Sequence, residues 1–167
     1  EALAHVFPQA PLRDFLIDCA NAAILESQGT EWRFAHDKLR EAIRKGMDAE
    51  QRKDLHRKVA ETLEDLYTGK EREALYASLA YHYEVAGAPD KAFQYFVQAG
   101  DSATKLYIYD QARAHYTAAE ALLSSLSGPH TGPRVRTDLM LRQLRCSLLH
   151  TPVPVNQSRV GQARELL

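Results

Sequence analysis

The sequence of 167 residues predicts a mainly α-helical protein, in which an antiparallel array of helices follows a smaller unit with one β-hairpin. Three observations predict this class. Apolar residues recur at helical spacing from about residue 48 onward. The one alternating stretch lies beside a Gly-containing turn near residue 29. Short loops containing Gly or Pro separate the periodic segments, as in helices that pack antiparallel with their neighbours.

The composition narrows the class of function. The formal net charge of -1 argues against a general nucleic-acid or membrane-surface protein, which carries an excess of basic residues. Cys19 and Cys146 lie among apolar residues, which is typical of buried thiols in a reducing compartment, although a disulfide between them stays open. We find no signal peptide or membrane-spanning run, so we expect a cytoplasmic protein that contacts neither membrane nor nucleic acid directly.

The first predicted helix begins at Pro11, because proline is favoured in the first turn of a helix. Its apolar stripe consists of Leu12, Phe15, Leu16 and Cys19. Two short runs around the turn Ser27–Thr30 then predict a β-hairpin near residues 23–35, with Trp32 and Phe34 on one face. A helix followed by a hairpin is the order of the C-terminal part of a winged-helix domain. We assign residues 1–46 to such a partial unit, and we expect the sequence to be a piece of a longer chain.

The stretch WRFAHDKLREAI, from Trp32 to Ile43, joins the hairpin to the next helix. Asp37 is the expected N-cap of that helix, because its carboxylate can accept a hydrogen bond from a backbone N–H of the first turn. Gly46 fits the end of the helix. His36 has two open explanations: it closes the hairpin without any ligand, or it contacts a ligand.

Residues 47–127 are expected to form the helical array, and residues 128–167 further helices after the break SGPHTGPR. Within the last part, a helix is predicted over residues 136–150, followed by TPVPV and a short helical segment. The apolar faces in the array are formed by Leu55, Val59, Leu63 and Leu66, by Leu75, Leu79, Tyr83 and Ala86, by Ala92, Phe96, Ala99, Ala103 and Leu106, and by Ala112, Tyr116, Ala119 and Leu123.

An internal repeat lies within this array. Its two copies, separated by 20 residues, read Ala92-x-x-x-Phe96-x-x-Ala99 and Ala112-x-x-x-Tyr116-x-x-Ala119. Upstream of the first copy stands Leu79-Ala80-x-x-Tyr83-x-x-x-Gly87, which completes a tetratricopeptide pattern. Because the spacing is shorter than a full repeat, we expect one long helix from about Pro89 to Tyr107 to bridge the two copies.

Tyrosines are dense in this region and allow two interpretations. Tetratricopeptide arrays often line a peptide groove with polar and aromatic side chains, but the same rings also fill the space between helices. Tyr83 and Tyr116 match motif positions, which favours helix packing. Tyr81, Tyr95 and Tyr109 do not match the motif and are candidates for a groove as much as for packing.

The sequence contains no motif for catalysis or metal binding. It has no phosphate-binding loop, no dinucleotide fingerprint and no cluster of His or Cys at metal-ligand spacing. Nothing assembles a nucleophile with a base. We therefore predict no catalytic residue and no metal ligand, and expect that this chain is not itself an enzyme.

One resemblance to a known family is carried by the stretch around His36. It fits the pattern aromatic-x-[FM]-x-H-D-x-[IL]-R-E-A through Phe34, His36, Asp37, Leu39, Arg40, Glu41 and Ala42. This stretch resembles the end of the winged-helix domain in signal-transduction ATPases with numerous domains, the STAND class. From about residue 11 to residue 126 the chain is similar to that domain end and the helical array that follows it in bacterial members, although the Tyr often found just beyond the motif is missing.

The resemblance implies a role in a nucleotide switch. The family's histidine, here His36, contacts the β-phosphate of ADP bound in the upstream ATPase domain of the same chain and stabilises the off state. Asp37 and Arg40 are the motif residues beside it, with Asp37 also the expected helix cap. The fragment itself would hold no cofactor, whereas the parent would bind ADP or ATP with Mg²⁺.

Two functions are consistent with these observations. The first is a non-catalytic regulatory or sensor segment of a signalling ATPase, such as a transcription activator or a kinase or cyclase regulator. Its helical array would receive a protein, peptide or inducer and couple that binding to the nucleotide state. The alternative is a stand-alone tetratricopeptide-like module for protein–protein interaction.

Overall fold

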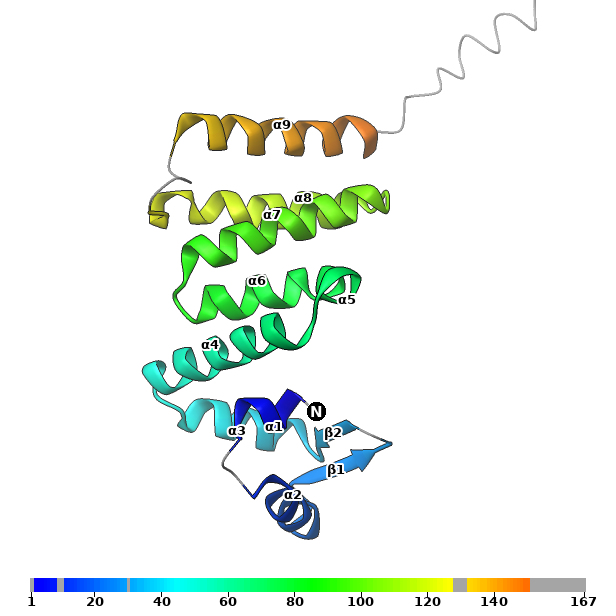
Figure 1. Ribbon diagram of the computed structural model, residues 1–167, viewed down its shortest axis with the longest axis vertical. Coiled ribbons are helices and arrows are strands. Elements are labelled where there is room, and N and C mark those ends of the chain that lie inside the picture. The colour runs from blue at the N-terminus through cyan, green and yellow to red at the C-terminus, as the bar shows by residue number, and fades with distance from the viewer. Residues whose placement is uncertain (1, 9–10, 30, 128–131, 151–167) are drawn as a thin grey trace, which may run out of the picture. The chain divides into compact units, whose positions relative to one another are not determined.

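The computed structural model describes residues 2–8, 11–29, 31–127 and 132–150. These residues form a mainly helical structure in which a two-stranded antiparallel β-hairpin precedes an array of helices, as predicted (Figure 1). The chain divides into two compact units, Glu1–Tyr95 and Phe96–Leu167, whose boundary falls inside a long helix. The predicted divisions at residues 46 and 127 follow sequence motifs and do not coincide with this boundary.

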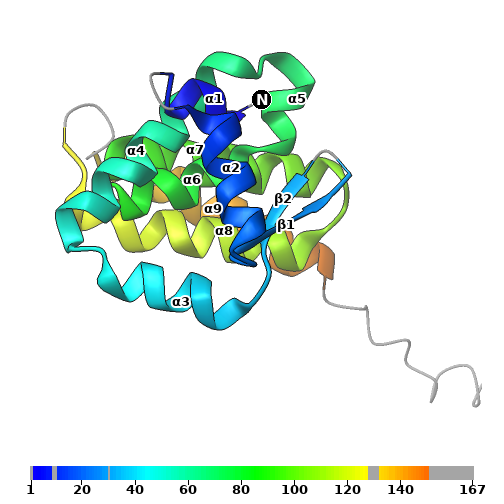
Figure 2. The ribbon, with the colours of Figure 1, turned by 90° about the horizontal axis from the view of Figure 1, so that it is seen from below.

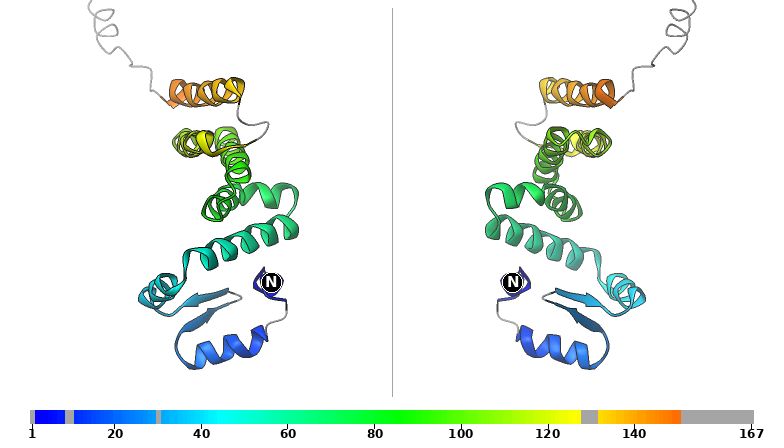
Figure 3. Two further views of the ribbon diagram at one scale, coloured as in Figure 1. Left: turned by 90° about the vertical axis from the view of Figure 1, so that its left-hand side faces the viewer. Right: turned by 90° about the vertical axis from the view of Figure 1, so that its right-hand side faces the viewer.

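The first unit begins with α1 (Ala2–Val6), α2 (Leu12–Asn21), the hairpin of β1 (Leu25–Gln28) and β2 (Glu31–Phe34), and α3 (Asp37–Gly46). Helix α2 packs beside β1, and β2 contacts α3 (Figure 3). The register pairs Leu25 with Phe34 and Gln28 with Glu31, and Gly29, just after β1, adopts a φ of 66°. The predicted hairpin is therefore confirmed, but Ser27 and Gln28, which were predicted in the turn, belong to β1.

The first unit continues with α4 (Ala49–Leu66), α5 (Gly69–Ala74), α6 (Tyr76–Val85) and the first part of α7 (Pro89–Lys105). Helix α4 packs against α6 and also contacts α1 (Figure 2). Asp48 and Gln51 form a capping box at the start of α4, with the N–H of Gln51 donating to Asp48 at 2.8 Å. Helix α5 was not predicted from the sequence, because its six residues are too few to show a helical period.

The core of the first unit is concentrated in its later helices. Ala60 is the first buried residue in the described part of the chain, and Leu79, Ala80 and Tyr83 of α6 are at most 1% exposed. Helices α2 and α3 contain no buried residue, and Phe15 of the predicted stripe is 57% exposed. The hairpin region is therefore much less tightly packed than the α4–α6 region.

The second unit contains the remainder of α7, α8 (Tyr109–Leu122), the 3-10 turn η1 (Leu123–Ser125) and α9 (Pro133–His150). Helices α8 and α9 pack together, and Tyr116, Leu139 and Cys146 are at most 2% exposed. The predicted long helix from Pro89 is confirmed, and both cysteines are free thiols. Part of the Gly/Pro break and the predicted segment after residue 150 lie outside the described residues.

Three helices end in the same hydrogen-bond pattern, the Schellman motif, in which one residue takes a left-handed conformation. These residues are Ala23 after α2 (φ 53°), Gly87 after α6 (φ 71°) and Tyr107 after α7 (φ 62°). In each motif the following residue donates its N–H to the carbonyl five positions earlier, at 2.9 Å. Glycine is the residue that adopts this conformation without strain, so Ala23 and Tyr107 are unfavourable choices.

Candidate functional site

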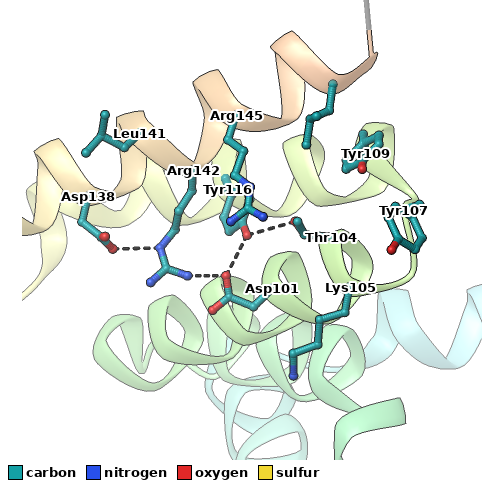
Figure 4. Close-up of a pocket in the computed structure, with 11 residues that line it drawn as sticks. Asp101, Thr104, Lys105, Tyr107, Tyr109, Tyr116, Asp138, Leu141, Arg142 and Arg145 are labelled. Carbon is teal, nitrogen blue, oxygen red and sulfur yellow. Dashed lines mark hydrogen bonds and ion pairs between the residues drawn. The ribbon is translucent and has the colours of Figure 1, made fainter.

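The candidate site is a cleft of about 620 Å³ within the second unit (Figure 4). Its walls come from the C-terminal part of α7, the loop and first turns of α8, and one side of α9. The side chains that line it combine charged, aromatic and aliphatic groups: Asp101, Thr104, Lys105, Tyr107, Tyr109, Tyr116, Asp138, Leu141, Arg142, Arg145 and Leu149. A cleft with apolar walls and a few converging polar groups is the usual form of a binding site.

One part of this cleft is an internally paired polar network. Asp101 accepts a hydrogen bond from the Tyr116 hydroxyl at 2.7 Å and forms an ion pair with Arg142. The Nε of Arg142 also donates to Asp138 at 2.8 Å. Thr104 donates to the carbonyl of Gly100 at 2.8 Å and lies 3.3 Å from the Tyr116 hydroxyl. Residues from α7, α8 and α9 are thereby held in fixed positions.

The charges in this network have shifted pKa values with identifiable causes. Burial lowers the pKa of Arg142, but its hydrogen bonds and ion pairs with Asp101 and Asp138 outweigh that effect and raise it above the ordinary value. Burial, with the hydrogen bond to Asp101, raises the pKa of Tyr116 to about 12. Both groups therefore keep their protons at neutral pH and act as fixed hydrogen-bond donors.

Packing in this unit depends on a glycine opposite the Tyr116 ring. A Cβ atom at Gly100 of α7 would overlap several atoms of that ring, so no larger residue fits without a shift. The ring is also fixed by its hydroxyl, which reaches Asp101. Gly100 therefore allows α7 and α8 to approach closely enough to place Asp101 beside Tyr116.

Several of the lining residues outside this network are exposed. Tyr107 is 77% exposed, and its ring lies perpendicular to that of Tyr109 with centroids 6.3 Å apart. Leu141 and Leu149 are 60% and 52% exposed. Arg145 is exposed and has no hydrogen bond or ion pair with any described residue. These groups are available to a ligand, unlike the paired network beside them.

The three predicted groove tyrosines have different positions. Tyr109 lines the cleft of the second unit, half-buried at the start of α8. Tyr81 is 49% exposed in the first unit, where its ring contacts His56 and His82 edge-on at 5.5 and 5.6 Å. Tyr95 is only 8% exposed. A groove role for Tyr95 is therefore wrong, because its ring is packed inside the first unit.

Tyr95 belongs to a partly buried network centred on Glu64 of α4. Glu64 accepts hydrogen bonds from Tyr95 at 2.5 Å, from Lys91 at 2.6 Å and from Tyr83. Burial raises the pKa of Glu64, but these hydrogen bonds outweigh it and leave the pKa below its ordinary value. The Tyr83 and Tyr95 rings stack with centroids 5.8 Å apart. The predicted packing role of Tyr83 is confirmed, as is that of buried Tyr116.

The predicted nucleotide-sensing residue, His36, occupies the N-cap position of α3. Its backbone is extended, its side chain is exposed, and it makes no capping hydrogen bond. The assignment of Asp37 as the cap is wrong, because Asp37 is already the first residue of the helix. Its 90% exposed carboxylate instead forms an ion pair with Arg40 at 3.2 Å. Asp37 and Arg40 also line two shallow clefts of about 510 and 480 Å³, whose lining residues do not include His36.

Two histidines in the first unit have unpaired nitrogen atoms. His56 of α4 and His82 of α6 have ring centroids 4.9 Å apart, and the Nδ1 atom of each is buried without a hydrogen-bond partner among the described residues. Burial lowers the pKa of both, and neighbouring charge, from Arg52 and Arg44 on His56 and from His56 on His82, lowers it further.

A search of the described residues found no group of three His, Cys, Asp or Glu side chains able to hold a metal ion. It also found no helix there that is long and apolar enough to cross a membrane. Comparison with models of known protein families, with curated proteins and with solved structures found no significant match to this chain.

Sequence reasoning missed most of the cleft. Of its lining residues only Tyr109 was predicted for a groove, whereas Asp101, Arg142 and Arg145 were not singled out. One signal was present in the sequence. Gly87 stands upstream of the first copy of the repeat, and the equivalent position upstream of the second copy, 20 residues later, is Tyr107. A bulky residue in place of a helix-ending glycine indicates a function other than chain reversal.

Proposed function

We propose that this chain is a non-catalytic, partner-binding regulatory segment, and that the cleft of the second unit receives an extended segment of a protein partner. The observation that carries the proposal is the division of the cleft into two parts. One part is a network of paired charges that fixes three helices, and the other is a set of exposed tyrosine, leucine and arginine side chains. Rigid support beside available aromatic and cationic groups is typical of recognition surfaces.

Selection from a random peptide library displayed on phage tests this proposal with the purified chain. We expect enrichment of peptides whose binding depends on Leu141, because a leucine that becomes buried contributes about 1.5–3 kcal/mol, or roughly tenfold or more in affinity. The variant Leu141→Gln should therefore lose about tenfold in affinity. Met140→Gln is the matched control, because Met140 is 51% exposed on the same helix but does not line the cleft. Enrichment no greater than for an unrelated protein, or equal binding by both variants, would contradict the proposal.

A second candidate function concerns His36. We propose that in a longer parent protein this residue contacts the phosphate of an ADP bound by an ATPase domain, so that the segment couples partner binding to a nucleotide switch. An exposed imidazole that caps nothing, beside the free N–H groups of the first turn of α3, fits a single phosphate contact. The pairing of Asp37 with Arg40 reduces the negative charge at that position.

This second proposal predicts a difference between the parent protein and the chain alone. The parent should co-purify with ADP, and His36→Ala should lower the amount of ADP retained. The chain alone should show no heat of ATP binding by calorimetry, because no phosphate-binding loop is present in its sequence. Lys45→Ala is a control within α3, since it removes an exposed charge that pairs with Glu41 and lies outside the motif. Unchanged ADP retention in the His36 variant would exclude the sensor role.

A further inference from the structure

Cationic side chains outnumber carboxylates among the residues that line the cleft of the second unit. Three cationic residues, Lys105, Arg142 and Arg145, face two carboxylates, Asp101 and Asp138. Both carboxylates pair with the same guanidinium, that of Arg142. Arg145, one turn further along α9, has no ion-pair partner among the described residues. The Arg145 guanidinium is therefore available to a negatively charged ligand group.

The cleft also presents an aromatic side chain in an unfavourable backbone conformation. Tyr107 is in the left-handed region at a φ of 62°, where the equivalent helix end has Gly87. Its ring is 77% exposed, so the residue gains little from packing in the free chain. Strain of this kind persists where the surrounding structure enforces it and is concentrated at binding sites. The ring is thereby held at the edge of the cleft.

The chemistry of the cleft favours an acidic peptide over a polyanion. Leu141 and Leu149 offer aliphatic surface, and Tyr107 and Tyr109 offer aromatic faces, to a ligand that also has apolar groups. Asp101 and Asp138 lie in the same cleft and would repel a nucleic acid or a polyphosphate with several adjacent charges. A single carboxylate flanked by apolar side chains matches a single available guanidinium.

We propose that the cleft binds an acidic peptide segment of the partner, in which Arg145 pairs with a carboxylate and Tyr107 covers an adjacent apolar side chain. This inference rests on the proposed partner-binding function and adds the chemical class of the partner. Arg145 selects the charge of the segment. Tyr107 supplies contact area with few rotatable bonds, which is the reason tyrosine is frequent at recognition surfaces.

Two short fluorescein-labelled peptides test the charge preference by fluorescence anisotropy. Both place one charged residue between apolar residues (Leu and Phe), and that residue is Glu in one peptide and Lys in the other. The wild-type chain should prefer the Glu peptide. Because Arg145→Glu replaces an attraction by a repulsion, it should weaken binding of the Glu peptide about tenfold and strengthen that of the Lys peptide. Arg136→Glu makes the same charge change on the same helix, outside the lining residues of this cleft, and should leave the preference unchanged.

Tyr107→Gly separates a binding role from a structural one, because the two roles predict opposite effects. The variant should melt at a higher temperature, since glycine relieves the strain at this φ, and yet bind the Glu peptide several-fold more weakly. Ala23→Gly is the matched control, because it relieves the same strain in an identical helix end of the first unit. It should raise the melting temperature without affecting peptide binding.

Several outcomes would overturn the inference. These are equal affinity for the two peptides, an unchanged preference in Arg145→Glu and in the milder Arg145→Gln, or full binding by Tyr107→Gly. Displacement of the Glu peptide by pyrophosphate at constant ionic strength would identify a phosphate site instead. If library selection yields cleft-dependent peptides without acidic residues, the inference fails while the proposed function stands. If it yields no cleft-dependent peptides, the proposed function itself fails.

Discussion

Helices α6 and α7 end in the same turn, but with different residues in the left-handed position. Both form the same hydrogen-bond pattern, and the two left-handed residues, Gly87 and Tyr107, are separated by the 20 residues that also separate the two copies of the repeat. At the end of α6 this residue is glycine, which adopts the left-handed conformation without strain. At the second end it is a bulky, exposed residue beside a cleft. The end of α7 is therefore not optimised for stability alone.

A second pair of equivalent positions, also 20 residues apart, has glycine at only one of its two members. The first repeat has Ala80 in α6, and the equivalent position 20 residues later is Gly100 in α7. Ala80 is fully buried, whereas a Cβ atom at Gly100 would overlap the Tyr116 ring. Phe96 occupies the position of Tyr116 in the first copy and has no hydroxyl. The glycine thus accompanies a tyrosine that must reach Asp101.

The largest effect that would test this comparison is expected from Gly100→Val. Overpacking a fixed aromatic ring costs about 1–3 kcal/mol, and the ring of Tyr116 cannot move without losing its hydrogen bond to Asp101. We therefore expect a loss of about 2–3 kcal/mol in the free energy of unfolding, measured by urea denaturation. Ala80→Gly, the reciprocal change, should cost about 1 kcal/mol through helix propensity and a further amount of up to about 1 kcal/mol for the buried methyl group that it removes. A smaller loss from Gly100→Val than from Ala80→Gly would mean that the ring does not restrict position 100.

A smaller effect is expected at the helix ends. Gly87→Ala places a Cβ atom at a φ of 71° and should destabilise the first unit by about 1 kcal/mol. The Cβ would meet no neighbouring atom, so the loss measures backbone strain alone. Thermal denaturation provides the measurement, and Gly46→Ala, at a glycine without a positive φ and in equally open space, is the control that should not destabilise. A neutral Gly87→Ala would show that a Cβ atom in this left-handed position is not strained, and therefore that Tyr107 is not strained by its φ.

The smallest effect concerns pH and the paired histidines of the first unit. The pKa values of His56 and His82 are lowered in the folded chain by burial and by nearby positive charge, so the unfolded chain binds more protons as the pH falls. Their contribution to stability is fully present above the unfolded pKa of about 6.5 and is lost as the pH falls through the lower folded values.

Urea midpoints at pH values above and below 6.5 measure this loss, which should be modest because both rings keep some contact with solvent. His82→Gln should flatten the pH dependence, because it removes one of the two proton-binding groups and relieves the other. The exposed His36 offers a matched substitution, His36→Gln, which leaves the buried pair in place. An unchanged slope in the His82 variant would show that the pair does not control the acid side of the stability curve.

Much of the fold could be predicted from local sequence signals. Gly29 between two alternating runs gave the hairpin, and Gly87 followed by Pro89 gave the turn between α6 and α7. The 20-residue spacing gave the long helix α7, because a spacing that short cannot contain a separate helix pair. These features depend on residues that are near one another in the sequence. The assignment of Asp37 differed by one position, which is the usual uncertainty of a helix end.

The candidate site could not be predicted in the same way. Arg142 of α9 meets Asp101 of α7 across 41 positions of sequence, so this contact exists only in the packed fold. Tyr95 was misassigned for the same reason: its helical face was clear, but its contact with Glu64 across 31 positions was not. Periodicity identifies the face of a helix, whereas the neighbour of that face depends on tertiary packing.

The tyrosines that are hydrogen-bonded to carboxylates also allow unfolding at high pH to be followed by absorbance. Burial and hydrogen bonding to Glu64 raise the pKa values of Tyr83 and Tyr95, and burial raises that of Tyr116 to about 12. Their contribution to stability is complete below the unfolded phenol pKa of about 10 and is lost as the pH rises through the folded values. An alkaline titration followed by the ultraviolet absorbance of phenolate would therefore show these three rings ionising as the helices around them separate. This change in absorbance would report the unfolding of each core without an added label.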